Sequence, residues 1–411
     1  METNQIKGRN PIKIFAIQVA HFHWILLGLG LLARILVMLY ASQLRTENYW
    51  EYGIIANNIL DGKGYSFNFT DQHLNFLNET YPSALMPPGY VFFILPFLLI
   101  KDIVFRNFLV FLIQIGLQIL AIWFSYQMLL EKWGKLAALI CLVLLCFLPD
   151  LIFACISIGP TVWFQFLLTM ILWFYRKNGK TSWLVLGLLA GILILMRSES
   201  IIIVAAIAVL HFKRSGLKFT FLFGSVVLLF LFPWVYRNFK VLGIGRISNN
   251  VGINFYRGNN AGEIGDWPQG FDKTYYLLRS NPETFEVKYD KYAFDRSITY
   301  IKSNPERWIW TLPEKLFRFV VIDWPDVRTH QVLYWFPWFI CLIFGFIGIK
   351  LGGTILKEEL IILLLFTTVM VVFFPQIRYQ TMIKFFFLPF SGIGLAHFFN
   401  YSNEMLKSKE I

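Results

Sequence analysis

Two carboxylates with the spacing and surroundings for chemistry, Glu47 and Glu51, follow directly after an apolar run at 24–41. They are four residues apart, so they lie one turn from each other if the segment is a helix. A carboxylate within hydrogen-bond reach of a hydroxyl group can take its proton while the oxygen attacks. Such an acid is more often a solvated surface group. The elements that position the two residues therefore decide between these interpretations.

The composition predicts a membrane protein that crosses the bilayer many times. Of its 411 residues, 57% are hydrophobic, 18% are aromatic and 15% are charged, whereas soluble domains are about 25% charged. The net charge is +12, but the basic residues are dispersed along loops, so no nucleic-acid partner is indicated. The four cysteines show no paired spacing typical of a metal site or a disulfide framework.

The topology follows from the lengths of apolar segments and the placement of Lys and Arg. A span needs about 20 apolar residues, and positive charges stay cytoplasmic. If the N-terminal segment lies inside, every short basic cluster falls on that same side, and both chain ends are cytoplasmic. The ten predicted spans lie near residues 24–41, 107–130, 135–149, 160–176, 182–196, 199–212, 218–235, 331–349, 358–374 and 381–399.

Two outer regions remain between these spans. The run 87–101 is not counted as a span, because Pro96 interrupts it and counting it would move the next basic clusters outside. Residues 42–106 are then one outer loop with surface helices at 48–60 and 88–100, and residues 236–330 form a second outer region. The sequence thus predicts an all-α polytopic membrane protein with three parts. They are a core at 1–235, an extracytoplasmic region at 236–330 and C-terminal spans at 331–411.

Two arginines are exceptions to the charge rule, because Arg197 and Arg378 lie in short outer turns that hold almost no other positive charge. The hairpin at 182–212 has arms of only about 21–22 Å at 1.5 Å per residue, against a hydrocarbon core of ~30 Å. The turn from Arg197 to Glu199 should therefore lie below the outer surface. Charged, non-helical backbone at that depth is tolerated inside protein or beside water. This predicts a cavity that opens to the outside.

Seven motifs carry a resemblance to a known family. The motifs are WEYGIIANNILDGKGYS (50–66), YPSALMPPGY (81–90), MRSE (196–199), PWVYRN (233–238), GINFYRGNN (252–260), YIKSNPERW (300–308) and IRYQTMIKFFFLPF (377–390). Together they resemble the bacterial branch of the GT-C glycosyltransferases, similar to the protein O-mannosyltransferases and lipid A aminoarabinose transferases. The resemblance runs in order from about residue 20 to 400.

The resemblance implies a GT-C fold and an inverting glycosyltransferase in the bacterial cytoplasmic (inner) membrane. Its donor would be a polyprenyl-phosphate-linked sugar, which is itself a membrane lipid, and its acceptor would lie on the outer side. The resemblance names neither the sugar nor the acceptor. An alternative class with similar spans is a lipid-linked glycan flippase or polymerase of the cell envelope.

The resemblance also implies roles for individual residues. Family members carry an acid just past the first span, a place that Glu47 roughly occupies. Counted strictly from Tyr52, the family acid falls on Asn48, and Glu51 is the second candidate for the base. The leaving phosphate gains charge that arginine donors can meet. Candidates for this phosphate site are Arg378, Arg197, Arg237 and Tyr379, and candidates for the cavity wall or the acceptor are Glu199, Asn259 and Asn260.

Simpler interpretations stand beside these roles. Arg197 is better explained by a pair with Glu199, and Arg237 can extend to the interface beside Trp234. The Asn259–Asn260 segment is typical of a turn. No metal ligand is assigned, and a divalent metal is the only cofactor left open.

Overall fold

The computed structural model describes residues 11–47, 49–68, 80–177, 183–262, 264 and 282–409. For residues 11–21, 282–283, 328 and 401–409 only the backbone is described. Each of the ten predicted spans coincides with a helix within this part of the chain. The helices are α1 (Pro11–Tyr40), α4 (Ile103–Trp133), α5 (Lys135–Phe147) with α6 (Pro149–Cys155), α7 (Thr161–Lys177), α8 (Trp183–Met196), α9 (Ile201–Ser215), α10 (Leu217–Leu242), α15 (Val332–Gly352), α16 (Lys357–Val372) and α17 (Ile377–Lys409).

The helices differ in whether they are long enough to cross a bilayer. Five of the described helices, α1, α4, α10, α15 and α17, are long and apolar enough, and α5 with α6 makes a sixth if this bent pair is one span. The pair is bent by 55°, and α6 begins at Pro149, which cannot continue the hydrogen bonding of α5. Helices α7, α8, α9 and α16 have 14 to 17 residues. The chain is therefore an all-helical polytopic membrane protein with several short helices in its core.

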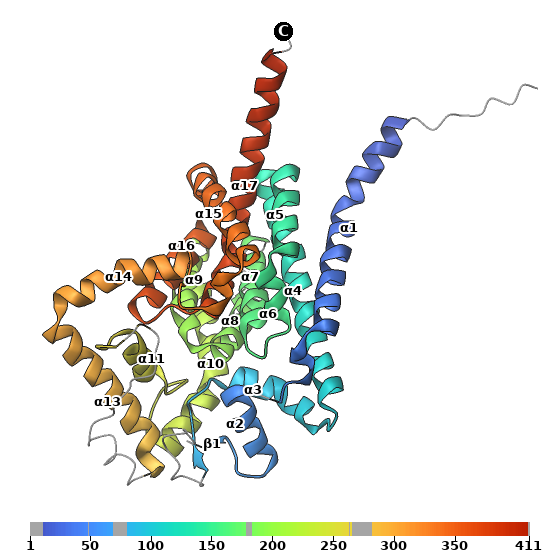
Figure 1. Ribbon diagram of the computed structural model, residues 1–411. Helices are drawn as coiled ribbons and strands as arrows, with labels where there is room; N and C mark the ends of the chain where they lie inside the picture. Colours follow the sequence, from blue (N-terminus) through green and yellow to red (C-terminus); the bar gives the residue numbers. More distant parts are fainter. Residues whose placement is uncertain are drawn as a thin grey trace, which may run out of the picture.

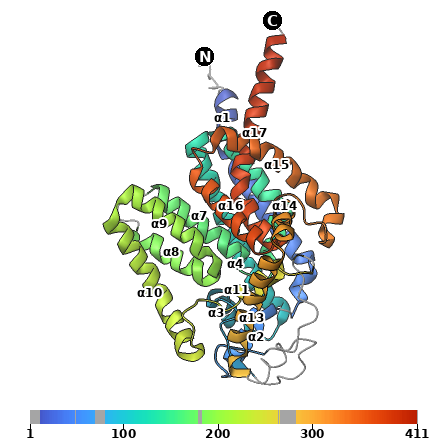
Figure 2. The same ribbon diagram turned by 90° about the vertical axis from the view of Figure 1, so that its left-hand side faces the viewer.

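The two regions that were predicted to lie outside, 42–106 and 236–330, form one layer at one end of the bundle (Figure 1). We call it the outer layer. In Figure 1, α2, α3, β1, α11 and α13 lie at the end opposite to the C-terminus. Figures 1 and 2 both show the N-terminal end of α1 and the C-terminal end of α17 at the same end of the bundle, opposite to these elements. The outer elements are η1 (Ser42–Arg45), α2 (Trp50–Leu60), β1 (Ser66–Phe67), β2 (Tyr81–Pro82), α3 (Pro88–Ile94), η2 (Leu95–Leu99), η4 (Ser198–Ser200), α11 (Val251–Gly258), α13 (Pro282–Ser303), α14 (Pro305–Val320) and η5 (Val327–His330).

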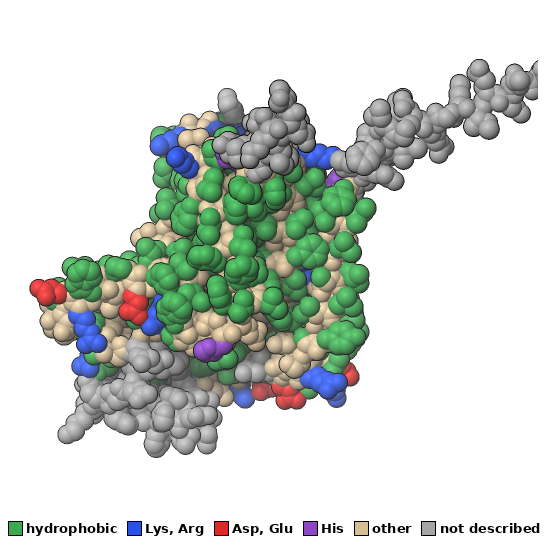
Figure 3. Space-filling view, turned by 45° about the horizontal axis from the view of Figure 1, so that its top comes forward, with side chains coloured by type: hydrophobic (Ala, Val, Ile, Leu, Met, Phe, Trp, Pro, Cys, Tyr) green, Lys and Arg blue, Asp and Glu red, His purple; other side chains and the backbone are tan. Residues whose placement is uncertain are grey.

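The surface of the bundle is apolar, as a lipid-facing surface requires. Hydrophobic side chains cover the middle of the face drawn in Figure 3, whereas charged side chains lie toward its two ends. Large exposed side chains such as Phe221 (71% exposed) and Leu229 (74%) on α10 belong to this surface. Exposed apolar area on this scale marks contact with a membrane.

Buried polar groups connect the core helices. Arg34 on α1 is fully buried, and its Nε donates to Gln118 Oε1 of α4 at 2.7 Å. Its NH1 group donates to the carbonyl oxygen of Cys146 on α5 at 2.8 Å. Lys384 on α17 forms a buried ion pair with Asp150 at the start of α6. Both charges are thus satisfied inside the bundle, as buried charges must be.

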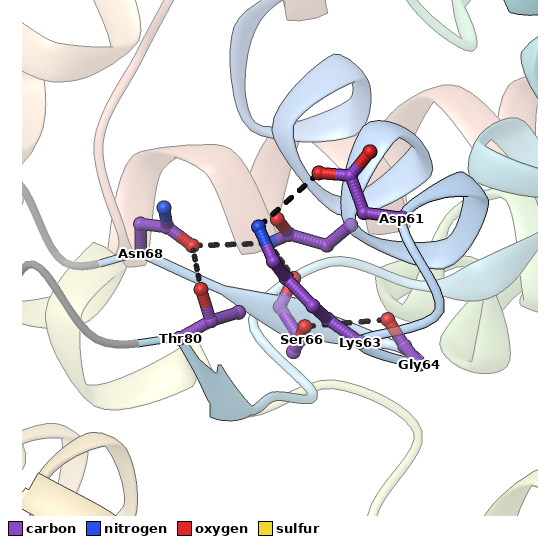
Figure 4. Close-up of polar contacts among 7 residues, drawn as sticks. Asp61, Lys63, Gly64, Ser66, Asn68 and Thr80 are labelled. Atoms are coloured by element: carbon purple, nitrogen blue, oxygen red, sulfur yellow. Dashed lines mark hydrogen bonds and ion pairs between the residues drawn. The ribbon is translucent and has the colours of Figure 1, made fainter.

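The first outer loop is folded by its own polar contacts. The amide of Asn58, near the end of α2, donates to Ser66 O at 2.9 Å and to Asn68 Oδ1 at 3.1 Å. Thr80 Oγ1 donates to the same oxygen of Asn68 at 2.9 Å, and Figure 4 shows Asn68 beside Thr80. Strands β1 and β2 pair antiparallel, with Ser66 opposite Pro82. The loop therefore presents α2 and α3 as a fixed unit.

Candidate functional site

Two arginines meet at one tyrosine at the outer end of the core. The Cζ atom of Arg197 lies 4.7 Å from the centre of the Tyr379 ring, and that of Arg378 lies 5.2 Å from it. The NH2 group of Arg378 also approaches the Tyr379 hydroxyl at 3.5 Å. We call these three residues the arginine–tyrosine cluster. It brings together the turn after α8 and the start of α17, which are far apart in the sequence.

The two arginines differ in how their charges are balanced. Arg197 is buried (7% exposed) and forms an ion pair with Glu199, with its Nε donating to Glu199 Oε1 at 2.7 Å. This confirms the predicted pairing across the turn. Arg378 is exposed, and no ion pair is found for it among the described residues. Arg378 therefore has donors to offer to a ligand, whereas Arg197 already has a carboxylate partner.

Close packing holds the turn that carries Arg197. It follows α8, and α3 of the first outer loop packs against the end of that helix. A Cβ atom added to Gly89 would lie 2.8 Å from the carbonyl carbon of Leu195, so only glycine allows this approach. On the other side, Ser198 Oγ lies 2.7 Å from Ser248 Oγ of the second outer region. Contacts with both outer regions thus hold the turn in place.

Tyr52 extends the cluster to the first outer loop. Burial raises the pKa of Tyr52 to about 12, while the charges of Arg197 and Arg378 oppose that shift. Its ring packs edge-on against Tyr90, with 5.0 Å between the ring centres. Tyr90 in turn donates to Gln114 Oε1 of α4 at 3.0 Å. Tyr52 therefore stays a neutral hydroxyl within electrostatic reach of the two guanidinium groups.

The two candidate acids lie in different settings. Helix α2 begins at Trp50 and not at residue 48 as expected, so Glu47 precedes it and is not one helical turn from Glu51. Trp50 has a φ of 54°, a value that non-glycine residues rarely adopt, so the chain turns sharply between the two acids. Glu47 is exposed and Glu51 is half-buried. Asn48 lies outside the described residues.

Arg237 does not join the arginine–tyrosine cluster by any of its contacts. Its guanidinium donates to the carbonyl oxygens of Ser83 at 2.5 Å and Tyr65 at 2.6 Å. It also lies over the Trp234 ring, with Cζ 5.2 Å from the ring centre. The expected contact with Trp234 is therefore present, and the charged group holds the first outer loop against α10.

Asn259 and Asn260 have local partners. The amide of Asn259 donates to Phe255 O at 2.8 Å and to Val372 O at 2.9 Å, and its oxygen accepts from Trp308 and Lys315. This buried side chain therefore joins α11, α14 and the end of α16. Asn260 donates to Tyr256 O at 2.7 Å and accepts from Gly262 N at 2.6 Å, as in a turn.

Buried titratable side chains join separate segments of the outer layer. Glu286 on α13 accepts from Ser83 Oγ at 2.5 Å and from Ala84 N at 2.9 Å. Burial raises the pKa of the Glu286 carboxyl to about 7, although these hydrogen bonds oppose the shift. Burial also lowers the pKa of Lys315 to about 8. Neither residue stands out in the sequence, because their partners are remote in the chain.

The arrangement offers donors for an anion and no ligand set for a metal. Among the residues that the structure describes, no group of three or more His, Cys, Asp or Glu side chains could hold a metal ion. The sequence did not predict that Tyr52 lies within electrostatic reach of Arg197 and Arg378. The sequence feature that could have indicated this position is the helical spacing of Tyr52 with Ile55 and Ala56, which are buried on the same face of α2.

Comparison with known proteins identifies the fold. No family model and no curated protein sequence matches the chain. The archaeal oligosaccharyltransferase AglB from Archaeoglobus fulgidus, in complex with an inhibitory peptide and a dolichol-phosphate, has a similar structure, with a TM-score of 0.50 and 13% identity over 96% of this chain. The chain spans 52%, about half, of the length of AglB.

A second solved structure is less similar. ArnT from Cupriavidus metallidurans, bound to undecaprenyl phosphate, has a TM-score of 0.36 and 10% identity over 93% of this chain and 77% of its own. The fold assignment therefore depends on AglB and on the arrangement of helices and outer loops described above. The chain therefore shares the fold of AglB, which is the GT-C fold predicted from the sequence.

Proposed function

We propose that the chain is an inverting glycosyltransferase that moves a sugar from a polyprenyl-phosphate donor to an acceptor on the outer side of the membrane. The observation that carries the proposal is the arginine–tyrosine cluster at the end of the core that faces the outer layer. The guanidinium of Arg378 and the hydroxyls of Tyr379 and Tyr52 supply donors suited to phosphate oxygens. The similarity to AglB, which binds a dolichol-phosphate, supports a lipid phosphate there.

The proposed reaction is a single displacement. A hydroxyl oxygen of the acceptor attacks the anomeric carbon while the bond from that carbon to the phosphate oxygen breaks. The electron pair goes to the phosphate, where Arg378 donates hydrogen bonds to the growing negative charge. Because the phosphate is already a stable anion, no general acid is needed at the leaving group.

We assign the base to Glu47. It is exposed, it lies in the non-helical link before α2, and no partner is found for its carboxylate among the described residues. An acceptor hydroxyl can therefore reach it, and the carboxylate can take the proton as the oxygen attacks. Glu51, half-buried in the first turn of α2, is the second candidate. Glu199 has a positioning role, because it holds Arg197 in place.

The test is release of the lipid carrier. The purified full-length protein is reconstituted in vesicles with polyprenyl-phosphate sugars labelled in the lipid, and a cell-envelope extract supplies acceptors. We expect free polyprenyl phosphate to accumulate with one of the sugars. A flippase would move the labelled donor across the bilayer without releasing polyprenyl phosphate, and a polymerase would release a lipid diphosphate or lengthen a lipid-linked glycan. Either result would replace the proposal by the alternative class.

A further inference from the structure

A basic cavity lies where helices α4, α7, α9 and α16 have the ends that were predicted to be cytoplasmic. Its volume is about 830 Å³. It is lined by more cations than anions, with Glu131 and Glu358 as its acidic residues. The cations are Lys132, Arg176, Lys177, Lys213, Arg214 and Lys357.

Half of these cations already have partners. Arg176 forms ion pairs with Glu358, at 3.1 Å, and with Glu359, and Lys177 pairs with Glu131 at 2.7 Å. The guanidinium of Arg214 donates to backbone carbonyl oxygens at the end of α7. These contacts tie the rims of the cavity together.

Three lysines from three helices remain, and none has an ion pair within the described part of the chain. They are Lys132 near the end of α4, Lys213 near the end of α9 and Lys357 at the start of α16. All three are exposed and line the same cavity. Like charges around one cavity repel each other, so an anion bound between them would stabilise the folded protein.

The surroundings of the cavity favour a lipid as the source of that anion. Its lining includes the apolar side chains of Met128, Trp173, Leu210 and Ile355. Next to it in the chain, the exposed Phe212 (50%) and Leu217 (73%) continue the apolar surface along α9 and α10. A headgroup could thus contact the lysines while its acyl chains lie against α9 and α10.

We propose that this cavity binds the phosphate-bearing headgroup of an anionic phospholipid in the leaflet opposite to the outer layer. Basic pockets between helix ends on the cytoplasmic side suit such headgroups, and anionic lipids concentrate in the cytoplasmic leaflet. The site is distinct from the arginine–tyrosine cluster, because Arg197, Arg378 and Tyr379 are not among its lining residues. The proposal does not depend on the proposed function.

The test compares lipids on the purified full-length protein in detergent. Binding of phosphatidylglycerol, phosphatidylcholine and inorganic phosphate is measured by native mass spectrometry and by the shift of the thermal unfolding midpoint. The test variant replaces Lys132, Lys213 and Lys357 by Gln. The matched control replaces the exposed Lys288, Lys291 and Lys302 of α13 by Gln, which removes the same charge from the outer layer.

We expect phosphatidylglycerol to bind more tightly than phosphatidylcholine and to raise the unfolding midpoint. The test variant should lose about tenfold or more in affinity, and the control less than about twofold. The lipid-free test variant should be at least as stable as the parent, because repulsion is relieved. If it does not fold, Lys213→Gln alone should lower the affinity several-fold.

Three outcomes would overturn the proposal. Equal binding of the two lipids, or equal losses in the test variant and the control, would mean that only the overall charge of the protein attracts anions. Stabilisation by inorganic phosphate as strong as that by phosphatidylglycerol would assign the cavity to a free phosphate ligand.

Discussion

At the scale of single residues, the paired charged side chains of the site have either a partner in the same turn or partners far away in the sequence. The pair of Arg197 with Glu199 was predicted because the two residues are neighbours in a short turn. The contacts of Arg237 with Ser83 O and Tyr65 O join residues 154 and 172 positions apart. No periodicity reveals such contacts, since they depend on how two outer regions dock. For the same reason, the sequence did not predict that Tyr52 lies near Arg197 and Arg378.

The assignment of the base predicts a difference between the two acids. Glu47→Gln keeps the volume of the side chain but cannot accept a proton, so turnover should fall by roughly 10²-fold or more. Glu51→Gln is the matched control and should retain most of the activity. Initial rates of polyprenyl phosphate release and the binding of donor lipid are measured for both variants. Loss of transfer in Glu51→Gln alone would move the base into α2.

The exposed arginine of the cluster gives a second prediction. Arg378→Ala should lower turnover by roughly 10²-fold, because it removes donors that meet charge in the transition state. Arg378→Lys should recover only part, since an ammonium group lacks the planar fork of a guanidinium. The control is Arg307→Ala, an exposed arginine of α14. Full activity in Arg378→Lys would show that the residue acts as no more than a point charge.

Glu286 predicts a dependence of stability on pH. Its folded-state pKa of about 7 lies above the ordinary pKa of about 4.5 for a glutamate, so the folded protein holds a proton that the unfolded chain releases. The contribution to stability is complete below about pH 4.5, is lost as the pH rises through about 7, and then stays constant. It amounts to at most roughly 3.5 kcal/mol at 1.4 kcal/mol per pKa unit.

The check is the thermal unfolding midpoint at pH 5 and at pH 8, for the parent and for Glu286→Gln. The variant has no carboxyl to titrate, so its midpoint should fall less over this interval. Burial raises the pKa of Asp290 in the same direction, which leaves some dependence in the variant. Identical pH profiles for the two proteins would mean that Glu286 does not titrate in this range.

At the scale of elements, hydropathy located the helices but not their bends or their docking. Every predicted span has its helix, because length and apolar content are local properties of the sequence. Helix α6 (Pro149–Cys155), which begins where the expected span 135–149 ends, was not predicted. Pro149 stood at the end of the expected span, where a proline indicates a stop and not a second helix.

The contact between α11 and the link from α16 to α17 gives an element-scale prediction. A Cβ atom added to Gly258 would lie 1.6 Å from the carbonyl oxygen of Phe373, so the segments must move apart. Gly258→Ala should therefore lower the free energy of unfolding by about 1–3 kcal/mol and should also reduce turnover, since the link leads into Arg378.

The control for this prediction is Gly245→Ala, because an added Cβ atom there meets no atom within 4 Å. Thermal unfolding in detergent and release of polyprenyl phosphate are measured for both variants. A Gly258→Ala protein as stable as Gly245→Ala would show that the two segments are not held at this distance.

At the scale of the whole molecule, the chain has two chemically different ends. The outer layer lies at one end of the bundle, and both described chain ends lie at the other (Figures 1 and 2). The arginine–tyrosine cluster lies next to the outer layer, and the basic cavity lies between the opposite ends of the helices. Donor binding at the first end requires that this end face the compartment of the acceptor. The placement of basic residues predicts that the second end faces the cytoplasm.

Cysteine labelling tests this orientation. The four native cysteines are buried, so they should react little with an impermeant thiol reagent in intact cells. Asn304→Cys, at the exposed junction of α13 and α14, should react from outside. Lys350→Cys, exposed near the end of α15, should react only after the cells are opened. Labelling of Lys350→Cys in intact cells, with Asn304→Cys protected, would invert the topology. The sugar transfer would then have to take place on the cytoplasmic side, which would contradict the outer acceptor of the proposed function.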